Sequence, residues 1–272
     1  MRPDVVDLRA FYASPLGAVA RRLVRRQVRG FWPDVSHLRV LGLGYATPFL
    51  RAFREEAERV LALMPAGQGV VHWPDDAPGL VALVEDDRLP LPDASVDRVL
   101  VVHGLEVSDQ VAASLREIWR VLTPAGRLIV VVPNRTGLWS RREGTPFAQG
   151  RPFSSRQLTQ ALRDSLFNPT RWASALHLPP SDMPMILRTA SGLETVGARW
   201  WPGFAGVHVV EASKQIYAVD GYLRAARARQ LRPSGVPVAV PAGFRRQPDS
   251  GSISGLAEQE HRLLAKEIGK AG

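Results

Sequence analysis

The chain has 272 residues, of which 45% are hydrophobic, and it contains no cysteine. This length and composition favour a globular protein and exclude a fibrous or wholly disordered chain. Without cysteine the chain has no disulfide bonds, thiolate zinc sites, iron–sulfur clusters or cysteine nucleophile. No segment approaches the roughly 18 consecutive apolar residues of a membrane span. We find no signal-peptide pattern and expect a cytoplasmic protein.

The formal net charge of +9 is concentrated in two segments. Residues 1–39 carry eight arginines and three acids, and residues 221–272 carry nine bases and four acids, so each segment has a net charge of +5. Residues 40–220 have a net charge of −1. Such basic flanks suit a nucleic acid, a membrane surface or an acidic protein partner, and they equally suit plain exposure to solvent.

The first basic segment is predicted to form two helices. Apolar residues recur between Val5 and Phe31 at steps of three and four, which is the period of a helix. Pro15 and Gly17 interrupt this pattern and divide it in two. The second helix carries five arginines that we expect on its solvent side: Arg21, Arg22, Arg25, Arg26 and Arg29. These arginines form either an ordinary solvated face or a dedicated anion-binding face.

Strands and helices alternate through the central segment. An apolar strand at 38–44 runs into Gly42 and Gly44, and a helix is predicted at 49–60. Further strands are predicted at 60–64, 79–84, 96–102, 127–133, 172–178 and 205–219. Further helices are predicted at 109–122, from Ser154 or Ser155 to 167, and at 182–195. This order predicts an α/β fold with a mostly parallel, seven-stranded sheet and helices on both faces.

The composition divides the chain into three parts. We expect a basic helical extension at 1–37, the α/β domain at 38–220, and a basic, partly disordered extension at 221–272 with one short helix at 256–268.

Three central segments carry recognisable motifs. They are the glycine-rich stretch 40–48, the segment 89–97 followed by His-Gly-Leu-Glu at 103–106, and the segment 115–128 with the sequence Leu-Arg-Glu-Ile-Trp-Arg-Val-Leu-Thr-Pro-Ala-Gly-Arg-Leu. In this order they resemble class I methyltransferases of type 11 that depend on S-adenosylmethionine, in the small-molecule group of the ubiquinone and menaquinone methylases. The resemblance covers about residues 38–219. It implies a Rossmann-like fold, S-adenosylmethionine as cofactor, and transfer of a methyl group to a small molecule.

The resemblance also implies a cofactor site at the carboxyl ends of the strands. The residues that it places there are Gly42, Gly44, Tyr45, Ala46, Met64, Glu85, Asp86, Leu89 and His103. Glu85 would accept the adenine amino group, or it belongs to an ordinary acidic loop. His103 is the candidate catalytic base; the alternative is a structural histidine, because methyl transfer depends mainly on alignment of the reactants. Glu106 is expected to cap or brace the next helix.

The chain departs from the family pattern at two acidic positions. The family has an acid where this chain has Gly42, and glycines where it has Ala46 and Pro48. The second strand ends in Met64 and Pro65 without the acid that would hold the ribose hydroxyls. The acids of the preceding helix are assigned to a solvated face: Glu55, Glu56 and Glu58. A second function therefore stays open, a methyltransferase-like binding or scaffolding protein that has lost the reaction.

Two further features bear on function. The loop 134–153 is rich in aromatic and cationic residues, so it either shapes a pocket for an anionic or planar substrate or leaves its arginines in water: Trp139, Arg141, Arg142, Phe147, Arg151 and Phe153. Methylation of RNA is a third hypothesis; it is supported by the basic flanks, but no Asn-Pro-Pro-Tyr motif occurs. Four histidines have no neighbouring His, Asp or Glu at metal-ligand spacing, so we expect no metal site: His72, His177, His208 and His261.

Overall fold

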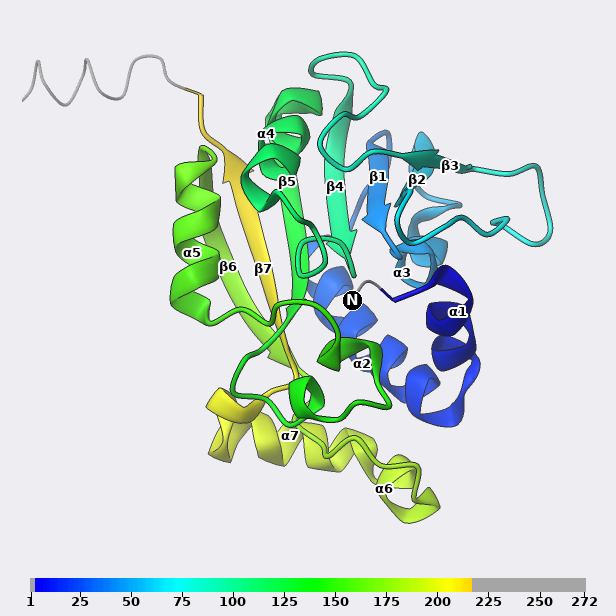
Figure 1. The fold of residues 1–272 in the computed structure, drawn as a ribbon, viewed down its shortest axis with the longest axis vertical. Helices are drawn as coiled ribbons and strands as arrows, with labels where there is room; N and C mark the ends of the chain where they lie inside the picture. Colours follow the sequence, from blue (N-terminus) through cyan, green and yellow to red (C-terminus); the bar gives the residue numbers. More distant parts are fainter. Residues whose placement is uncertain (1–2, 217–272) are drawn as a thin grey trace, which may run out of the picture. The chain divides into compact units, whose positions relative to one another are not determined.

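The computed structural model describes residues 3–216, and its centre is a seven-stranded sheet (Figure 1). The strands are β1 (Arg39–Gly44), β2 (Arg59–Pro65), β3 (Val81–Val84), β4 (Val96–Val102), β5 (Leu122–Pro133), β6 (Phe167–Ala175) and β7 (Val207–Lys214). Their order in the sheet is β3-β2-β1-β4-β5-β7-β6. Strands β1 to β5 are parallel, and β7 runs antiparallel to both of its neighbours. The prediction of a mostly parallel, Rossmann-like α/β sheet is confirmed.

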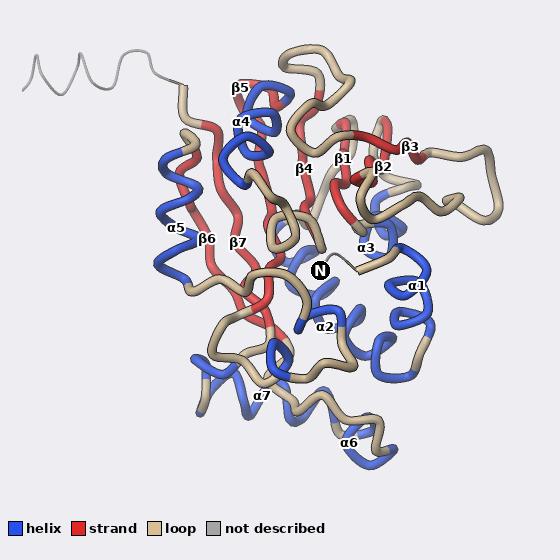
Figure 2. The backbone as a smooth tube through the Cα atoms, in the orientation of Figure 1, coloured by secondary structure: helices blue, strands red, loops and turns tan. Residues whose placement is uncertain are grey.

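Helices cover both faces of this sheet (Figure 2). They are α1 (Val5–Ala13), α2 (Pro15–Phe31), α3 (Thr47–Leu50), α4 (Val111–Val121), α5 (Ser155–Asp164), α6 (Pro184–Arg188) and α7 (Ala190–Trp200). Apolar side chains of α4 and α5, such as Ile118 and Leu158, pack with Leu128 of β5 on one face. Side chains of α1, α2 and α3 pack with Val40 and Leu100 on the other face. Both N-terminal helices therefore share one hydrophobic core with the sheet.

The predicted division of the N-terminal segment into two helices is confirmed. Ser14 ends α1 and begins α2, and its side-chain oxygen accepts a hydrogen bond of 3.0 Å from the backbone nitrogen of Gly17. Pro15 fits the first turn of α2, where its missing N–H is not needed. Four of the five predicted arginines of α2 are exposed, but Arg29 is half-buried and pairs with Glu56 at 2.7 Å.

The helix predicted at 49–60 is wrong, because α3 has only four residues and is followed by a 3₁₀ turn at 51–53. The reason lies in Glu56, which is half-buried rather than on a solvated helical face. Its carboxylate accepts hydrogen bonds from the Arg29 guanidinium and, at 2.8 Å, from the Val35 backbone nitrogen. These contacts tie the chain to the end of α2 and turn it into β2.

Other boundaries also differ from the predictions; for example, β5 begins at Leu122 rather than at 127, and β7 spans Val207–Lys214 rather than 205–219. Helix α5 ends at Asp164 rather than at 167, because Leu166 has a φ of 63° that a helix cannot continue through. Strand β6 consequently begins at Phe167, five residues earlier than predicted. The helix predicted at 182–195 is divided at Thr189 into α6 and α7. The helix predicted at 256–268 lies outside the described residues.

Candidate functional site

Three parallel strands end side by side at the carboxyl edge of the sheet, where open α/β sheets bind their ligands. After β1 the chain turns at Gly44, which has a φ of 78°. A Cβ atom on Gly44 would lie 2.3 Å from the carbonyl oxygen of Val102, the last residue of β4. The backbone nitrogen of Tyr45 donates a hydrogen bond of 2.8 Å to this same oxygen. Only glycine therefore allows the turn to cross so close to β4.

Gly42 has a packing role. A Cβ atom there would lie 2.5 Å from the side chain of Leu50 and 2.8 Å from Ala46. Ala46 precedes α3 and provides no side-chain cap. The glycine at position 42 therefore lets the short helix α3 pack directly on β1.

A buried chain of hydrogen bonds occupies the edge between β1 and β4. The Tyr12 hydroxyl of α1 lies 2.8 Å from Nε2 of His103, and Nδ1 of His103 lies 3.2 Å from Oε1 of Glu106. All three side chains are buried. His103 has a φ of 50° and directly follows β4. Oε2 of Glu106 is buried and has no hydrogen-bond partner in the described part of the chain.

Tyr12 also closes the space above the strand ends. Its ring stacks on that of Tyr45 at 5.8 Å between centroids, and Phe147 approaches His103 at 5.0 Å. The side chain of Gln68, which follows β2, donates a hydrogen bond of 2.6 Å to the carbonyl oxygen of His103. Burial, with a smaller contribution from Glu106, raises the pKa of Tyr12 well above its usual value of 10.0, so the phenol stays protonated. The neutral side chain of Tyr12 thus covers the carboxyl ends of β1 and β4.

Met64 lies at the end of β2 next to the glycine turn and belongs to the same hydrophobic cluster as Tyr12 and Tyr45, whereas Leu89 is buried in the cluster on the opposite face of the sheet. Glu85 is exposed in a turn that it closes with Arg88, and Asp86 is half-buried in the same turn. The structure therefore brings together six predicted residues at the glycine turn and the ends of β2 and β4: Gly42, Gly44, Tyr45, Ala46, Met64 and His103. The three others lie in or directly after the turn that follows β3: Glu85, Asp86 and Leu89.

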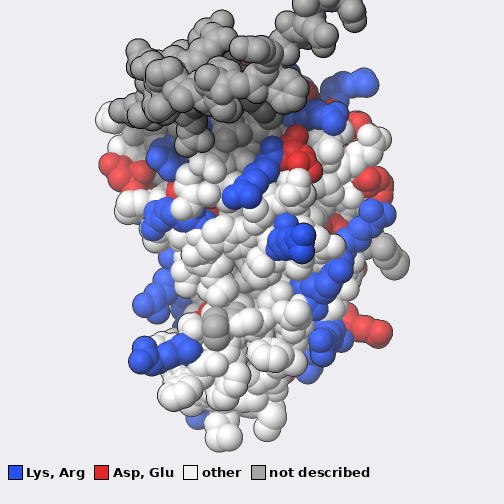
Figure 3. Space-filling model, turned by 90° about the vertical axis from the view of Figure 1, so that its left-hand side faces the viewer, with Lys and Arg blue, Asp and Glu red and all other residues white. Residues whose placement is uncertain are grey.

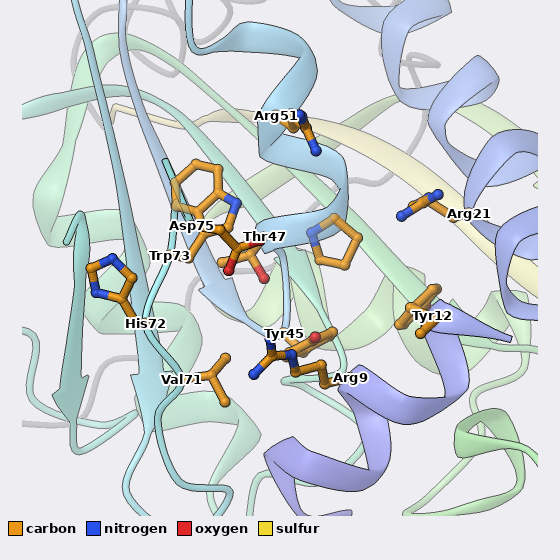
Figure 4. A pocket seen from close by; sticks show the side chains of 12 residues that line it. Arg9, Tyr12, Arg21, Tyr45, Thr47, Arg51, Val71, His72, Trp73 and Asp75 are labelled. Carbon is orange, nitrogen blue, oxygen red and sulfur yellow. The ribbon is translucent and has the colours of Figure 1, made fainter. Parts of the chain in front are cut away.

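A pocket of about 240 Å³ lies beside the glycine turn (Figure 4). Three arginines line it: Arg9 of α1, Arg21 of α2 and Arg51 of the turn after α3. All three are exposed, and none makes a hydrogen bond or ion pair with another residue between 3 and 216. We call it the arginine pocket, and its other lining residues are Tyr12, Ala13, Tyr45, Thr47, Pro48, Val71, His72, Trp73 and Asp75.

The loop 134–153 contributes to the core rather than to this pocket. Trp139 and Phe147 are fully buried, and their rings meet edge to face at 5.4 Å. The indole nitrogen of Trp139 donates to the carbonyl oxygen of Leu178. Arg141, Arg142 and Arg151 are exposed. Of the two interpretations of this loop, the exposed arginines agree with the one that leaves them in water.

Sequence reasoning missed Tyr12, Gln68 and the three arginines of the pocket as parts of one site. Tyr12 lies within the helical repeat of apolar residues between Val5 and Phe31, and its side chain is buried in α1. The hydroxyl of Tyr12 bonds to His103, which lies 91 residues further along the chain, so no local pattern predicts the contact. Arg9, Arg21 and Arg51 come from three elements that only the tertiary fold brings together.

Two negative findings apply to the described residues. Between residues 3 and 216, no group of three or more His, Asp or Glu side chains is arranged to hold a metal ion. None of the helices in this range has both the length and the apolar character required to span a membrane.

Comparison with known proteins agrees with this architecture. Residues 34–130 match a family model described as a methyltransferase domain. A demethylmenaquinone methyltransferase of Deinococcus radiodurans is 44% identical over 54 residues, which are 19% of this chain and 22% of that protein. A ubiquinone/menaquinone biosynthesis C-methyltransferase of Rubrivivax gelatinosus is 38% identical over 55 residues, 20% of this chain and 22% of that protein. The chain thus matches only about a fifth of the length of these curated relatives.

Solved structures show the same fold over more of the chain. A methyltransferase of Thermotoga maritima that depends on S-adenosylmethionine has a TM-score of 0.55 at 18% identity, covering 78% of this chain and 96% of its own. Another from Mesorhizobium loti has a TM-score of 0.50 at 19% identity, covering 69% and 95%. Residues 34–130 thus resemble a methyltransferase domain, the chain shares the fold of S-adenosylmethionine-dependent methyltransferases, and its predicted resemblance to the ubiquinone and menaquinone methylases is confirmed over 19–20% of its length.

Proposed function

We propose that the protein binds S-adenosylmethionine at the carboxyl edge of the sheet and transfers its methyl group to a small molecule in the cytoplasm. The observation that carries this proposal is the orphaned Oε2 of Glu106, a buried carboxylate oxygen without a described partner at the edge where ligands of this fold bind. An unpaired buried carboxylate is costly, and a cationic ligand would relieve that cost.

The residues of the edge fit such a cofactor once Tyr12 moves aside. S-adenosylmethionine carries a positively charged sulfonium and supplies an electrophilic methyl group. Glu106 would provide the carboxylate that is missing at Gly42, and His103 would orient Glu106 through the bond to Oε1. The turn at Gly44 would bring backbone groups close to the ligand, and Glu85 stays our candidate for the adenine amino group. Movement of Tyr12 would expose this set.

The position of Tyr12 over the strand ends favours a second candidate function. Tyr12 fills the edge and is hydrogen-bonded to His103, and neither Gly42 nor Pro65 supplies the usual acid. In this alternative the domain has lost the reaction and serves as a binding or scaffolding module. Methylation of RNA stays third. In the view of Figure 3, Lys and Arg side chains are spread over the surface, several lie beside acids, and large uncharged areas separate them.

Calorimetric titration with S-adenosylmethionine and S-adenosylhomocysteine tests the first candidate against the second. We expect micromolar binding that Glu106→Gln weakens by about tenfold, because an amide keeps the bond to His103 but loses the charge. Glu85→Ala should weaken it as well. Glu211→Gln is the matched control, since Glu211 is an equally buried carboxylate on β7. Absence of binding to folded protein, checked by circular dichroism, would favour the scaffolding alternative.

A further inference from the structure

The arginine pocket holds three like charges that no salt bridge within residues 3–216 neutralises. Some other arginines of the domain are paired with carboxylates, for example Arg39 with Asp97 at 3.0 Å and Arg120 with Asp93 at 2.7 Å. Arg9, Arg21 and Arg51 have no such partner among residues 3–216. Cations brought together in this way repel one another, and an anion between them removes the repulsion.

The three guanidinium groups approach the pocket from different sides. Arg9 and Arg21 lie on the two N-terminal helices, and Arg51 follows α3 (Figure 4). The positive charges of Arg9 and Arg21 reach the Tyr45 hydroxyl, where they oppose the effect of burial, which raises the pKa of Tyr45. One acid, Asp75, is present on the wall. The walls therefore carry three positive charges and one negative charge.

Aromatic side chains contribute to the rest of the lining. The side chains of Tyr12, Tyr45 and Trp73 line the pocket (Figure 4). Planar rings next to guanidinium groups suit a planar organic group that carries negative charge. The volume of about 240 Å³ is below the roughly 300–1,000 Å³ of common ligand pockets, so the ligand is small.

We propose that the arginine pocket binds a small phosphate ester with a planar ring, at a site separate from the strand edge. A phosphate monoester carries nearly two negative charges and three acceptor oxygens, so it can engage three guanidinium groups, whereas one carboxylate offers two oxygens and one charge. Of the nine predicted cofactor residues, Tyr45 lines the pocket, but Gly42, Gly44 and His103 do not. The proposal does not depend on methyl transfer.

Phenyl phosphate is the probe, titrated calorimetrically into the full-length protein at constant ionic strength. Inorganic phosphate, phenol and benzoate test the anion alone, the ring alone and a carboxylate on the same ring. We expect phenyl phosphate to bind at least about tenfold more tightly than each of the three, because only it satisfies both the arginines and the rings. Benzoate binding as tightly as phenyl phosphate would overturn the assignment to a phosphate.

Substitutions then locate the site. Arg21→Gln should weaken phenyl phosphate binding by about tenfold, since it removes one of the three guanidinium partners. Arg26→Gln is the matched control, because Arg26 is an exposed, unpaired arginine of the same helix that does not line the pocket. It should change the affinity less than about twofold. Equal losses in the two variants would show a general charge effect and overturn the proposal.

Two further measurements separate the ring from the anion and the pocket from the strand edge. Trp73→Leu should reduce the affinity for phenyl phosphate toward that for inorganic phosphate and leave the latter unchanged; equal loss of both would overturn the role of the ring. S-adenosylmethionine, which has no phosphate, should not displace phenyl phosphate. Displacement would assign the pocket to the cofactor and overturn the proposal, whereas failure of S-adenosylmethionine to bind anywhere would affect only the proposed methyl transfer.

Discussion

Two strand–helix–strand units of the same sheet differ in how closely they follow the methyltransferase pattern. In residues 96–133, helix α4 has eleven residues and buries Leu115, Ile118 and Val121. In residues 39–65, helix α3 has four residues and is reached through the glycine turn. The first unit has the long, buried helix that stabilises the sheet. The second unit departs from the pattern at the strand ends, the place where ligands of this fold bind.

Side-chain hydrogen bonds explain why the first unit is so regular. Arg120 of α4 donates to the carbonyl oxygens of Leu89 and Leu91 and pairs with Asp93, so it fixes the loop before β4. Glu117 accepts a hydrogen bond from the backbone nitrogen of Leu89 at 2.9 Å. The motif residues Leu89, Glu117 and Arg120 therefore stabilise the loop before β4, and this role does not depend on catalysis.

The largest effect that would test this contrast is expected from Gly44→Ala. The substitution places a Cβ atom 2.3 Å from a backbone oxygen at a φ of 78°, so both steric overlap and left-handed backbone strain oppose it. We expect the free energy of unfolding to fall by about 2–5 kcal/mol, as measured by urea denaturation. Gly144→Ala is the control, since nothing lies within 4 Å of a Cβ there. A neutral result at Gly44 would mean that the turn relaxes readily and is not fixed by β4.

Tyr12→Phe tests whether the bond from Tyr12 to His103 keeps the strand ends covered. Loss of the hydroxyl leaves Nε2 of His103 without its hydrogen-bond partner, which should cost about 1–3 kcal/mol near pH 8. Because the pKa of Tyr12 is raised in the folded protein, the unfolded chain loses this proton at lower pH than the folded chain does. Stability provided by the neutral phenol is therefore lost as the pH rises above about 10.

The measurement is urea denaturation of both proteins at about pH 8 and about pH 10.5. The difference in stability should be largest at the lower pH and smaller at the higher pH. Tyr45→Phe is the comparison: burial raises the pKa of Tyr45 as well, so its pH dependence should change in the same direction, but the bond from Tyr12 to His103 is kept. Parallel pH profiles of wild type and Tyr12→Phe would show that the phenol does not ionise in this range.

The regularity of the first unit also explains what the sequence could predict. Strands β4 and β5 are buried on both faces, so their residues form nearly continuous apolar runs that mark them. The extent of α3 was mispredicted because the local pattern of Phe49 and Phe53 continues a helical period, while the contact of Glu56 with Val35 that ends the helix comes from a distant segment. Local periodicity carries no information on such contacts.

The candidate site was less predictable for the same reason. The turn at Gly44 has a sequence signature, since glycine accepts a positive φ. The bond from Tyr12 to His103 has none, because tyrosine in an apolar helical stripe is equally consistent with plain packing. The chemistry of the edge therefore depends on contacts between α1 and the strand ends that only the fold defines.

The smallest of the expected effects concerns the N-terminal caps of helices α5 and α3. Helix α5 packs on the same face as α4 and begins with a capping box, in which the Ser154 side chain accepts from the Gln157 backbone and the Gln157 side chain accepts from the Ser154 backbone. Ser154→Ala should lower the free energy of unfolding by about 1 kcal/mol. Ser155→Ala, one residue further along and exposed, should leave it nearly unchanged.

Helix α3 has no comparable cap, because Ala46 precedes it and offers no side-chain acceptor. If Ser154→Ala costs as expected, α5 is stabilised by its own ends as well as by the burial of Leu158 and Leu162. Helix α3, in contrast, depends on packing, against Gly42 of β1, against α2 and against Tyr12 of α1. A helix held only by packing is the one that can shift when a neighbour moves. An unaffected Ser154→Ala protein would instead make α5 equally dependent on packing, and the proposed difference between scaffold and ligand edge would not extend to the helix ends.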